Sequence, residues 1–276
     1  MTNPAHITRC EVRVVHLARA TARRILMEGE LARVGVAADG WDAVDAIEAA
    51  NAQRLAAMPD SGAWGAMHGH AKGCLASHLD ALAAFLRGDA SHLLMLEDDV
   101  FLADDLAEWV RGDYWPQGAD VLKLERWRDD RLKIMLDRTA HSHANRKIQR
   151  LRTRHSGSAG YIITRAGAQI VLSAGLLSLP VDHLLFKPFV SPVARRLAIY
   201  QVTPALVVQG NEPAVTRTGT GRKARKSLGH KLQRLAAELA VLRQAPRLAL
   251  GTSHLTSVAW RSNGQSEPDT QHTSKG

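Results

Sequence analysis

The feature that most constrains this chain is an apolar run that ends in three consecutive carboxylates. The stretch HLLMLEDDVFLADD spans residues 92–105, and in it four apolar residues precede Glu97, Asp98 and Asp99. A short run that is apolar at every position predicts a buried strand. Three adjacent like charges at the end of such a strand repel one another, so their position needs a physical reason.

The rest of the chain alternates between strand-like and helix-like segments. The strand-like segments are EVRVVHL (11–17), HLLML (92–96), ADVLKLE (119–125), the first part of AGYIITRAGAQIVLSAG (159–175), and AIYQVTPALVVQ (198–209), which is broken at Pro204. The helix-like segments are ATARRILMEGELARV (20–34), WDAVDAIEAANAQRLAAM (41–58), AKGCLASHLDALAAFLRG (71–88) and the second part of 159–175. This alternation predicts an α/β fold with a mostly parallel central sheet flanked by helices.

Composition places the chain among soluble globular proteins. Of its 276 residues 45% are hydrophobic and 23% charged, and no run of 18 apolar residues would span a membrane. The start, MTNPAHITRCEVRVV, lacks the layout of a signal peptide, so no export is expected. Cys10 and Cys74 form no CxxC pair, which indicates a reducing cytoplasm and no structural zinc site.

The net charge of +9 is concentrated near the C-terminus. Residues 217–247 contain nine Lys or Arg against one acid, Glu238, which gives +8. A second basic run, RKIQRLRTR (146–154), is balanced by acids elsewhere. Such clusters favour anionic partners, namely nucleic acid, membrane headgroups or phosphorylated glycans.

The composition changes after Pro213, so we expect a domain over residues 1–212 and a basic tail over 213–276. In the tail, KLQRLAAELAVLRQ (231–244) predicts a short amphipathic helix, and SNGQSEPDTQHTSKG (262–276) is typical of disorder. Nucleic-acid binding through the tail would need aromatic platforms, but residues 217–247 contain no Phe, Tyr or Trp. We therefore expect no nucleic-acid partner.

The acidic triplet is explained best by a bound cation. Ligands of open α/β sheets bind beyond the carboxyl ends of the strands, where Glu97, Asp98 and Asp99 would lie. Oxygen ligands alone favour a hard divalent ion, Mg²⁺ or Mn²⁺. Because residues i and i+2 at a strand end point the same way, Glu97 and Asp99 would share the ion and Asp98 would face another polar partner.

Two other interpretations of the triplet remain open. It would also suit a solvated strand end before a helix, where acids interact favourably with the helix dipole. A receiver domain has a similar acidic pair, but that pair lies near the N-terminus and is followed by a strand with a phosphate-accepting Asp. Here the triplet starts at position 97, and DVLKLERWRDD (120–130) does not supply that strand.

The chain resembles bacterial lipopolysaccharide glycosyltransferases of family 25. The resemblance covers roughly residues 11–212, and it depends on the order of the blocks, since no single block is specific. The blocks are VVHLARATARR, VAADG (36–40), GCLASH (73–78), LMLEDDVFL, DVLKLE, GSAGYIITRAGA (157–168), LPVDHLLF (179–186) and YQVTPALVVQ (200–209). The match is clearest with galactosyltransferase-like members.

This resemblance implies a GT-A-like fold and transfer of a hexose with inversion. The donor would be a UDP-sugar, most simply UDP-galactose, and the acceptor a lipopolysaccharide oligosaccharide made at the inner face of the inner membrane. The triplet would act as the DxD motif, with Asp99 as main metal ligand and Glu97 or Asp98 directed toward the ion or the ribose. The basic tail would hold the enzyme on the anionic membrane surface.

The resemblance also places Asp182, in the block LPVDHLLF, as the general base of the transfer. The other interpretations of Asp182 are a helix N-cap and a contact to the metal. The neighbouring His183 is a weaker candidate for the base.

Several further residues are expected near the donor, each with a structural alternative. Arg19 and Arg23 would grip the diphosphate or the uracil edge, or lie on a solvated helix face. Ser77 and His78 would lie by the donor, or His78 would simply be a satisfied buried histidine. Gly157 and Ser158 would let the backbone approach the sugar closely, or would simply form a turn before the strand that follows. The donor-binding set is Arg19, Arg23, Ser77, His78, Asp98, Gly157 and Ser158.

The chain departs from the family at two places, both of which concern the nucleobase pocket. His16-Leu17 stands where the family has Asn-Leu or Ser-Leu, and the segment between Arg24 and Asp39 is several residues short. A non-catalytic glycan- or nucleotide-sugar-binding protein of the same fold is therefore the alternative function.

Overall fold

The structure is a computed structural model of the whole chain, and it describes residues 9–262 except 42, 63–64, 112, 128–131, 176–177 and 211–244. Most of the basic run and the expected amphipathic helix therefore lie outside the described residues. Within those described, no helix is both long and apolar enough to cross a membrane.

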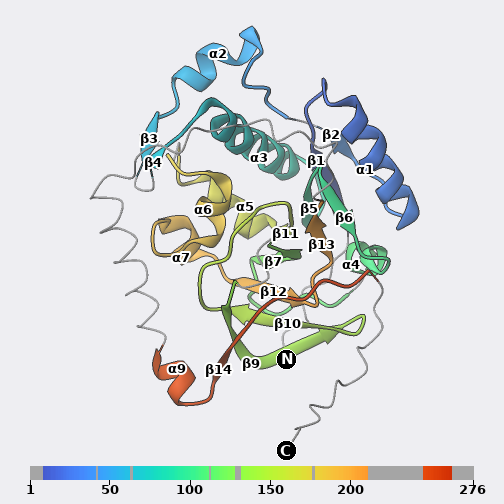
Figure 1. Cartoon of the computed structure of the whole chain (residues 1–276), viewed down its shortest axis with the longest axis vertical. Coiled ribbons are helices and arrows are strands. Elements are labelled where there is room, and N and C mark those ends of the chain that lie inside the picture. Colours follow the sequence, from blue (N-terminus) through green and yellow to red (C-terminus); the bar gives the residue numbers. More distant parts are fainter. Residues whose placement is uncertain are drawn as a thin grey trace, which may run out of the picture.

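Among the described residues, a nine-stranded sheet forms the centre of the molecule (Figure 1). Its order is β14-β9-β10-β12-β7-β11-β5-β1-β2. The strands are β1 (Cys10–Val15), β2 (Gly40–Trp41), β5 (His92–Glu97), β7 (Val121–Lys123), β9 (Ile134–His143), β10 (Arg146–Leu151), β11 (Gly160–Thr164), β12 (Ile199–Thr203) and β14 (Ser253–Thr256).

Smaller strands and the helices complete the fold. The smaller strands are β3 (Ser61–Gly62), β4 (Gly65–Ala66), β6 (Val100–Leu102), β8 (Glu125–Arg126) and β13 (Val207–Gln209), of which β6, β13 and β8 pair with one another. The helices are α1 (Thr21–Arg33), α2 (Ala49–Ala56), α3 (Gly69–Arg87), α4 (Leu106–Arg111), α5 (Arg165–Leu172), α6 (Val181–Phe186), α7 (Pro192–Arg196) and α9 (Ala245–Ala249).

The described part of the sheet is mixed rather than mostly parallel. The ladders β2–β1, β1–β5 and β7–β12 are parallel, as expected from the alternating pattern. The ladders β5–β11, β11–β7, β12–β10, β10–β9 and β9–β14 are antiparallel, which corrects that prediction for these strands. The expected α/β class is thus confirmed, with a large mixed sheet between helices.

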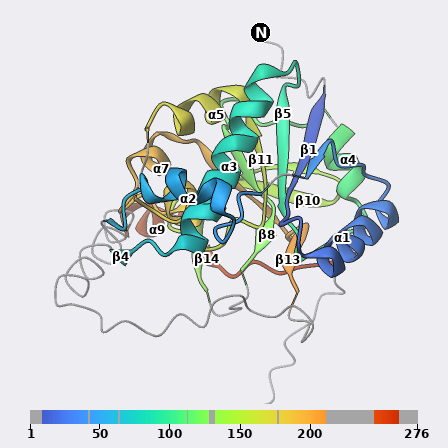
Figure 2. The ribbon, with the colours of Figure 1, turned by 90° about the horizontal axis from the view of Figure 1, so that it is seen from above.

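The apolar run of β5 is buried because both faces of the sheet are covered. Leu93 and Met95 pack in the core that includes α3, α5 and α6, whereas Leu94 and Leu96 pack in the core that includes α1 and α4. In Figure 2, α3 and α5 lie on one side of β5 and β1, and α1 and α4 on the other. A strand between two cores has no solvent face, so it need not alternate.

Local signals explain several element boundaries. Gly88 ends α3, as predicted. The side chain of Thr164 accepts a hydrogen bond from the Gly167 amide and caps α5. The second expected helix is shorter than its pattern, since Trp41 joins β2 and α2 begins only at Ala49.

The second basic run begins with strand β10 of a hairpin, which no pattern in its sequence predicts. Ala144 and Asn145 form the two-residue turn to β9, and both have positive φ, 45° and 58°. Arg146, 1% exposed, donates two hydrogen bonds to Asp105, of 2.7 and 2.5 Å, and others to the carbonyls of residues 204, 205 and 261.

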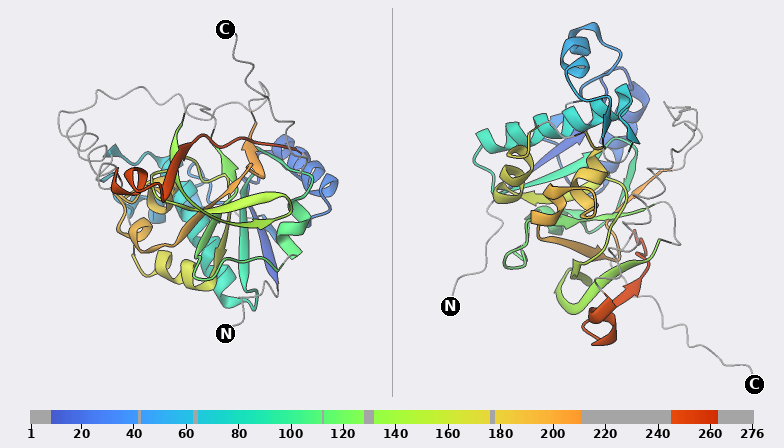
Figure 3. Two further views of the ribbon diagram at one scale, coloured as in Figure 1. Left: turned by 90° about the horizontal axis from the view of Figure 1, so that it is seen from below. Right: turned by 90° about the vertical axis from the view of Figure 1, so that its left-hand side faces the viewer.

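Part of the expected tail belongs to the same sheet as residues 1–212. Strand β14 pairs antiparallel with β9, with Ser253 opposite Asp137, and Val258 lies in the core. Trp260 forms a bridge with Ala205. Figure 3 shows this segment in red, running along the hairpin of β9 and β10.

Candidate active site

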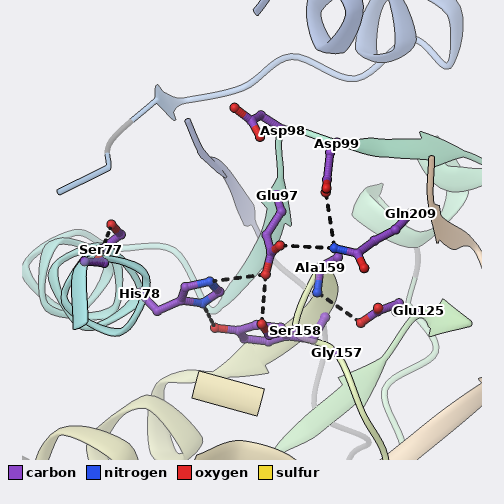
Figure 4. A network of polar contacts seen from close by, with 12 residues as sticks. Ser77, His78, Glu97, Asp98, Asp99, Glu125, Gly157, Ser158, Ala159 and Gln209 are labelled. Carbon is purple, nitrogen blue, oxygen red and sulfur yellow. Dashed lines mark hydrogen bonds and ion pairs between the residues drawn. The ribbon is translucent and has the colours of Figure 1, made fainter. Parts of the chain in front are cut away.

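The acidic triplet lies at the edge of the sheet where parallel strands β1 and β5 end. Val15 of β1 is opposite Glu97, the last residue of β5, and Asp98 and Asp99 turn the chain into β6. Strand β11 starts at this same edge, with Gly160 opposite Leu96. The segment 157–159 before β11 is therefore brought to the triplet (Figure 4).

Glu97 and Asp99 converge on one point, and an amide group occupies it. The side-chain nitrogen of Gln209, Nε2, lies 3.3 Å from Glu97 Oε2 and 3.2 Å from Asp99 Oδ1. Figure 4 shows both carboxylates directed at this nitrogen, which belongs to the last residue of β13. The i, i+2 geometry expected from the sequence therefore holds. Gln209 ends one of the quoted blocks, but nothing in the local pattern shows that it meets the triplet.

Asp98 is turned away from this point. Its carboxylate, 8% exposed, lies 2.9 Å from His16 Nδ1 and accepts a 3.0 Å hydrogen bond from Arg23 Nη1. Asp98 thus has the separate polar partners that the strand geometry predicts. His16, noted only as a departure from the family pattern, is one of them, and Arg23 holds this carboxylate instead of pointing freely from its helix.

Glu97 is surrounded by groups that favour its neutral form and groups that hold its position. Burial, together with the negative charges of Asp99 and Glu125, raises the pKa of Glu97 to about 8. Ser158 Oγ donates a 2.8 Å hydrogen bond to Glu97 Oε1, and His78 Nε2 lies 3.9 Å from the same oxygen. The structure therefore brings the predicted Ser158 and His78 to the triplet.

The two residues of the SH pair have different environments. His78 is 1% exposed, its Nδ1 lies 2.9 Å from the Tyr161 hydroxyl, and burial lowers its pKa to about 4. Ser77 points elsewhere: its hydroxyl donates to the Gly73 carbonyl and accepts from the Val44 amide, both at 2.7 Å. Ser77 thus fixes the loop before α2, and only His78 faces Glu97.

Gly157 is required by its close approach to a buried carboxylate. It has φ +78°, and a Cβ built on it would lie 2.1 Å from Glu125 Oε1. Glu125 accepts a 2.8 Å hydrogen bond from Lys123 Nζ and a 3.0 Å bond from the Ala159 amide. Lys123 and Glu125 are both fully buried, so this ion pair supports the segment that carries Ser158.

Arg19 is paired with an acid of the loop before α2. Its guanidinium donates to the Asp45 carboxylate, and this hydrogen bond lowers the pKa of Asp45. Asp45 also accepts a 3.1 Å hydrogen bond from the Ile47 amide. Arg19 is therefore held by the loop before α2, and its side chain is 45% exposed.

Asp182 lies in the first turn of α6, next to a lysine. Its Oδ2 accepts a 3.1 Å hydrogen bond from Lys187 Nζ and lies 3.7 Å from His183 Nε2. The N-cap of α6 is Pro180, without a side-chain cap, so the N-cap interpretation of Asp182 does not hold. Helix α6 packs against α3, the helix that carries His78.

The described residues fit a hard divalent ion at one position. The observation is that Glu97 and Asp99 already direct one oxygen each at a single electropositive group, the Gln209 amide. Carboxylate oxygens that converge in this way are the ligands that Mg²⁺ and Mn²⁺ prefer. Asp98 points to His16 and Arg23, so Glu97 and Asp99 are the residues to hold such an ion.

Comparison with known proteins adds an independent observation. The model of "Glycosyltransferase family 25 (LPS biosynthesis protein)" matches residues 10–185. The chain is 26% identical over 207 residues to "Lacto-N-neotetraose biosynthesis glycosyltransferase LgtE" of Neisseria gonorrhoeae, a match that covers 71% of this chain and 72% of that protein. It is 28% identical over 144 residues to "Lipooligosaccharide biosynthesis protein lic2B" of Haemophilus influenzae, covering 50% and 53%.

The extent of these matches differs between relatives. For the Haemophilus proteins the match spans about half of the relative's length, 48% to 53%. The matched family region nevertheless includes the triplet, the SH pair, the segment 157–159 and Asp182. Because the family model matches well over half of the chain, the chain belongs to glycosyltransferase family 25.

Proposed function

We propose that the chain is an inverting hexosyltransferase that moves galactose from UDP-galactose onto a lipopolysaccharide or lipooligosaccharide acceptor, on a GT-A-like fold. Family membership supports glycosyl transfer, and the names of the relatives support this class of acceptor. The observation that carries the proposal is the convergence of Glu97 and Asp99 beyond the end of β5. The helix of Asp182, α6, packs against α3, which carries His78.

The proposed cofactor is Mn²⁺ or Mg²⁺, held by Glu97 and Asp99. When bound, it would stabilise the departing diphosphate as a Lewis acid. In this proposal the Gln209 amide yields its position between the two carboxylates. Ser158 then continues to orient Glu97 through its 2.8 Å hydrogen bond.

The proposed base is Asp182. In a single displacement the acceptor hydroxyl gives its proton to the Asp182 carboxylate, its oxygen bonds to the anomeric carbon, and the bond from that carbon to the diphosphate oxygen breaks. Lys187 donates a 3.1 Å hydrogen bond to the Asp182 carboxylate and so orients it for the transfer.

The donor-binding roles are proposed for residues around the triplet. Gly157 and Ser158 would let the sugar approach the backbone closely, while His78 would line the same side. Arg23, near Asp98, and Arg19, near Asp45, would meet the diphosphate or the uracil edge. Ser77 would contribute indirectly, by holding the loop at Val44.

We also propose that the chain works at the inner face of the inner membrane, as a peripheral protein. The support is the basic run of residues 217–247, because each Lys or Arg near an anionic surface contributes about 1 kcal/mol of binding. The implied acceptor is an anionic, lipid-linked glycan made at that surface.

The experiment is a panel of UDP-sugars with Mn²⁺, in which release of UDP is measured with and without a lipooligosaccharide acceptor. We expect UDP-galactose to react, EDTA to stop the reaction, and Asp99→Asn to abolish it while the protein stays folded. Asp104→Asn is the matched control, since Asp104 lies in the same acidic stretch but pairs with Arg33 at the surface.

Two outcomes would contradict parts of the proposal. Full turnover of Asp99→Asn, or of the wild type in EDTA, rules out the metal role. Tight binding of UDP-galactose without turnover on any acceptor favours the alternative, a nucleotide-sugar-binding protein of the same fold.

A further inference from the structure

Three side chains of different chemistry meet beside the triplet. Cys74 and His78 lie one turn apart on α3, and Glu97 ends β5. One ligand atom from each of the three, a sulfur, a ring nitrogen and a carboxylate oxygen, lies within 4.8 Å of the other two. Residues at i and i+4 share one face of a helix, which is why two of the three come from the same helix.

His78 is the residue that points to a ligand. It is 1% exposed, and its Nε2 has no hydrogen-bond partner within the described residues, although most buried polar atoms are paired. This nitrogen is directed at Glu97, 3.9 Å from Oε1 (Figure 4). The other nitrogen, Nδ1, is held by the Tyr161 hydroxyl at 2.9 Å. Metal-binding histidines commonly have one nitrogen held in this way and the other free to bind.

The charges around this point are predominantly negative. Burial and the carboxylates Glu97, Asp182 and Asp99 raise the pKa of the Cys74 thiol. Imidazole nitrogen is a common ligand of divalent ions, and the buried Nε2 of His78 is directed at this point. A divalent cation would offset the repulsion among these groups, which a buried water cannot do.

We propose that Cys74, His78 and Glu97 form a binding site for a divalent ion of the zinc class. Thiolate and imidazole ligands select Zn²⁺ over Mg²⁺ and Mn²⁺, which prefer oxygen ligands alone. Binding releases the proton of the Cys74 thiol, and that of Glu97 where it is protonated, to solvent. Three protein ligands leave a fourth position for water or for an oxygen of a substrate.

This site differs from the proposed hard-ion site, although both use Glu97. The zinc-class site needs Cys74 and His78, whereas the hard-ion site needs Asp99. Because Glu97 serves both, occupation of one site competes with occupation of the other. The spacing of the two cysteines does not predict this site, because Cys74 meets Glu97 through the fold and not through a CxxC motif.

The test is titration of the full chain, reduced and freed of metal, with Co²⁺ as the probe. We expect one equivalent to bind with a thiolate-to-cobalt charge-transfer band in the near ultraviolet, and Zn²⁺ to displace it. Cys74→Ser should lose the band. His78→Gln should weaken Co²⁺ binding by about 100-fold or more. Loss of a residue that only hydrogen-bonds a metal ligand usually lowers metal affinity by about 10- to 100-fold, and His78 is itself a proposed ligand.

Two control variants make the result specific. Cys10→Ser removes the chain's other cysteine, which is buried in β1, and should keep the band. Asp99→Asn should also keep it, and so separates this site from the proposed catalytic ion. Absence of the band in the folded wild type, or its survival in Cys74→Ser, overturns the proposal. If Cys74→Ser does not fold, unchanged Zn²⁺ affinity of His78→Gln by calorimetry overturns it equally.

Discussion

At the scale of single residues, Asp182 gives the sharpest test of the reaction. The Asp182→Asn variant keeps the shape of the side chain and an oxygen that accepts from Lys187, but it loses the group that takes a proton. We expect the turnover rate to fall by about two to four orders of magnitude, the usual contribution of general-base catalysis. The donor Kd should change little, and steady-state kinetics together with calorimetry measure both quantities.

Lys187→Met is the matched control for Asp182. It removes the cationic partner of the ion pair and leaves the Asp182 carboxylate in place. The contradicting outcome is that both variants lower the free energy of unfolding by a similar amount while the turnover rate stays unchanged. In that case Asp182 only stabilises the fold through its ion pair with Lys187, and another group is the base.

Gly157 supports a second prediction at the residue scale, because the chain offers a matched glycine. Gly157 and Gly118 have similar positive φ values, +78° and +74°, but only a Cβ on Gly157 would meet an atom, Glu125 Oε1 at 2.1 Å. Both alanine variants lose about 1 kcal/mol to the left-handed backbone. Gly157→Ala should lose about 2 kcal/mol more, since it displaces a buried, paired carboxylate.

Urea unfolding of the two glycine variants measures this difference. Equal stabilities would show that the Glu125 side chain moves aside without cost. In that case the segment 157–159 is not fixed by the Lys123–Glu125 pair.

At the scale of elements, hairpin β9–β10 contains two arginine pairs of unequal burial. Arg146 and Asp105 are 1% and 9% exposed in their side chains, against 27% and 16% for Arg152 and Asp137. We expect Arg146→Met to lower the free energy of unfolding by about 3–5 kcal/mol, because it leaves Asp105 buried and unpaired. Arg152→Met should cost about 1 kcal/mol or less.

Chemical denaturation of the two arginine variants decides this prediction. A cost for Arg146→Met no larger than that for Arg152→Met would mean that Asp105 becomes hydrated when its partner is removed. The hairpin would then depend mainly on its apolar face.

The same hairpin shows which elements could be predicted from the sequence. α1, α3 and β5 have strong local patterns, and Gly88 marks the end of α3. The hairpin was missed because its turn, Ala144-Asn145, lacks the usual Asn-Gly or Asp-Gly pair, and because charged residues obscure the alternation. The antiparallel ladders involve that hairpin and β11. No local sequence pattern shows in which direction β11 runs relative to β5, so these ladders could not be predicted.

At the scale of the whole molecule, the site could be predicted only in part. The triplet is a contiguous signal, so its position at a strand end and the separate direction of Asp98 followed from strand geometry. Gln209 and Cys74 meet Glu97 through contacts across 112 and 23 positions of the chain, which only the fold brings together.

The basic run gives a prediction for the whole molecule. We expect the chain to co-sediment with anionic vesicles at low salt and to be released at high salt, because screening weakens charge attraction. Replacing the eight Lys and Arg of residues 217–243 by Gln should abolish this binding and leave UDP release intact. Equal sedimentation of the two proteins, or none by the wild type at low salt, would assign the run another role.

Strand β14 has a consequence for how this chain can vary. Residues 211–244 begin just after β13 and end at α9, close to the strand that completes the sheet on β9, so the fold fixes both ends of this segment. If the chain were cut before α9, strand β9 would lose its partner β14 and become an unpaired edge of the sheet. A shortened form of this protein therefore has to keep the strand that follows α9.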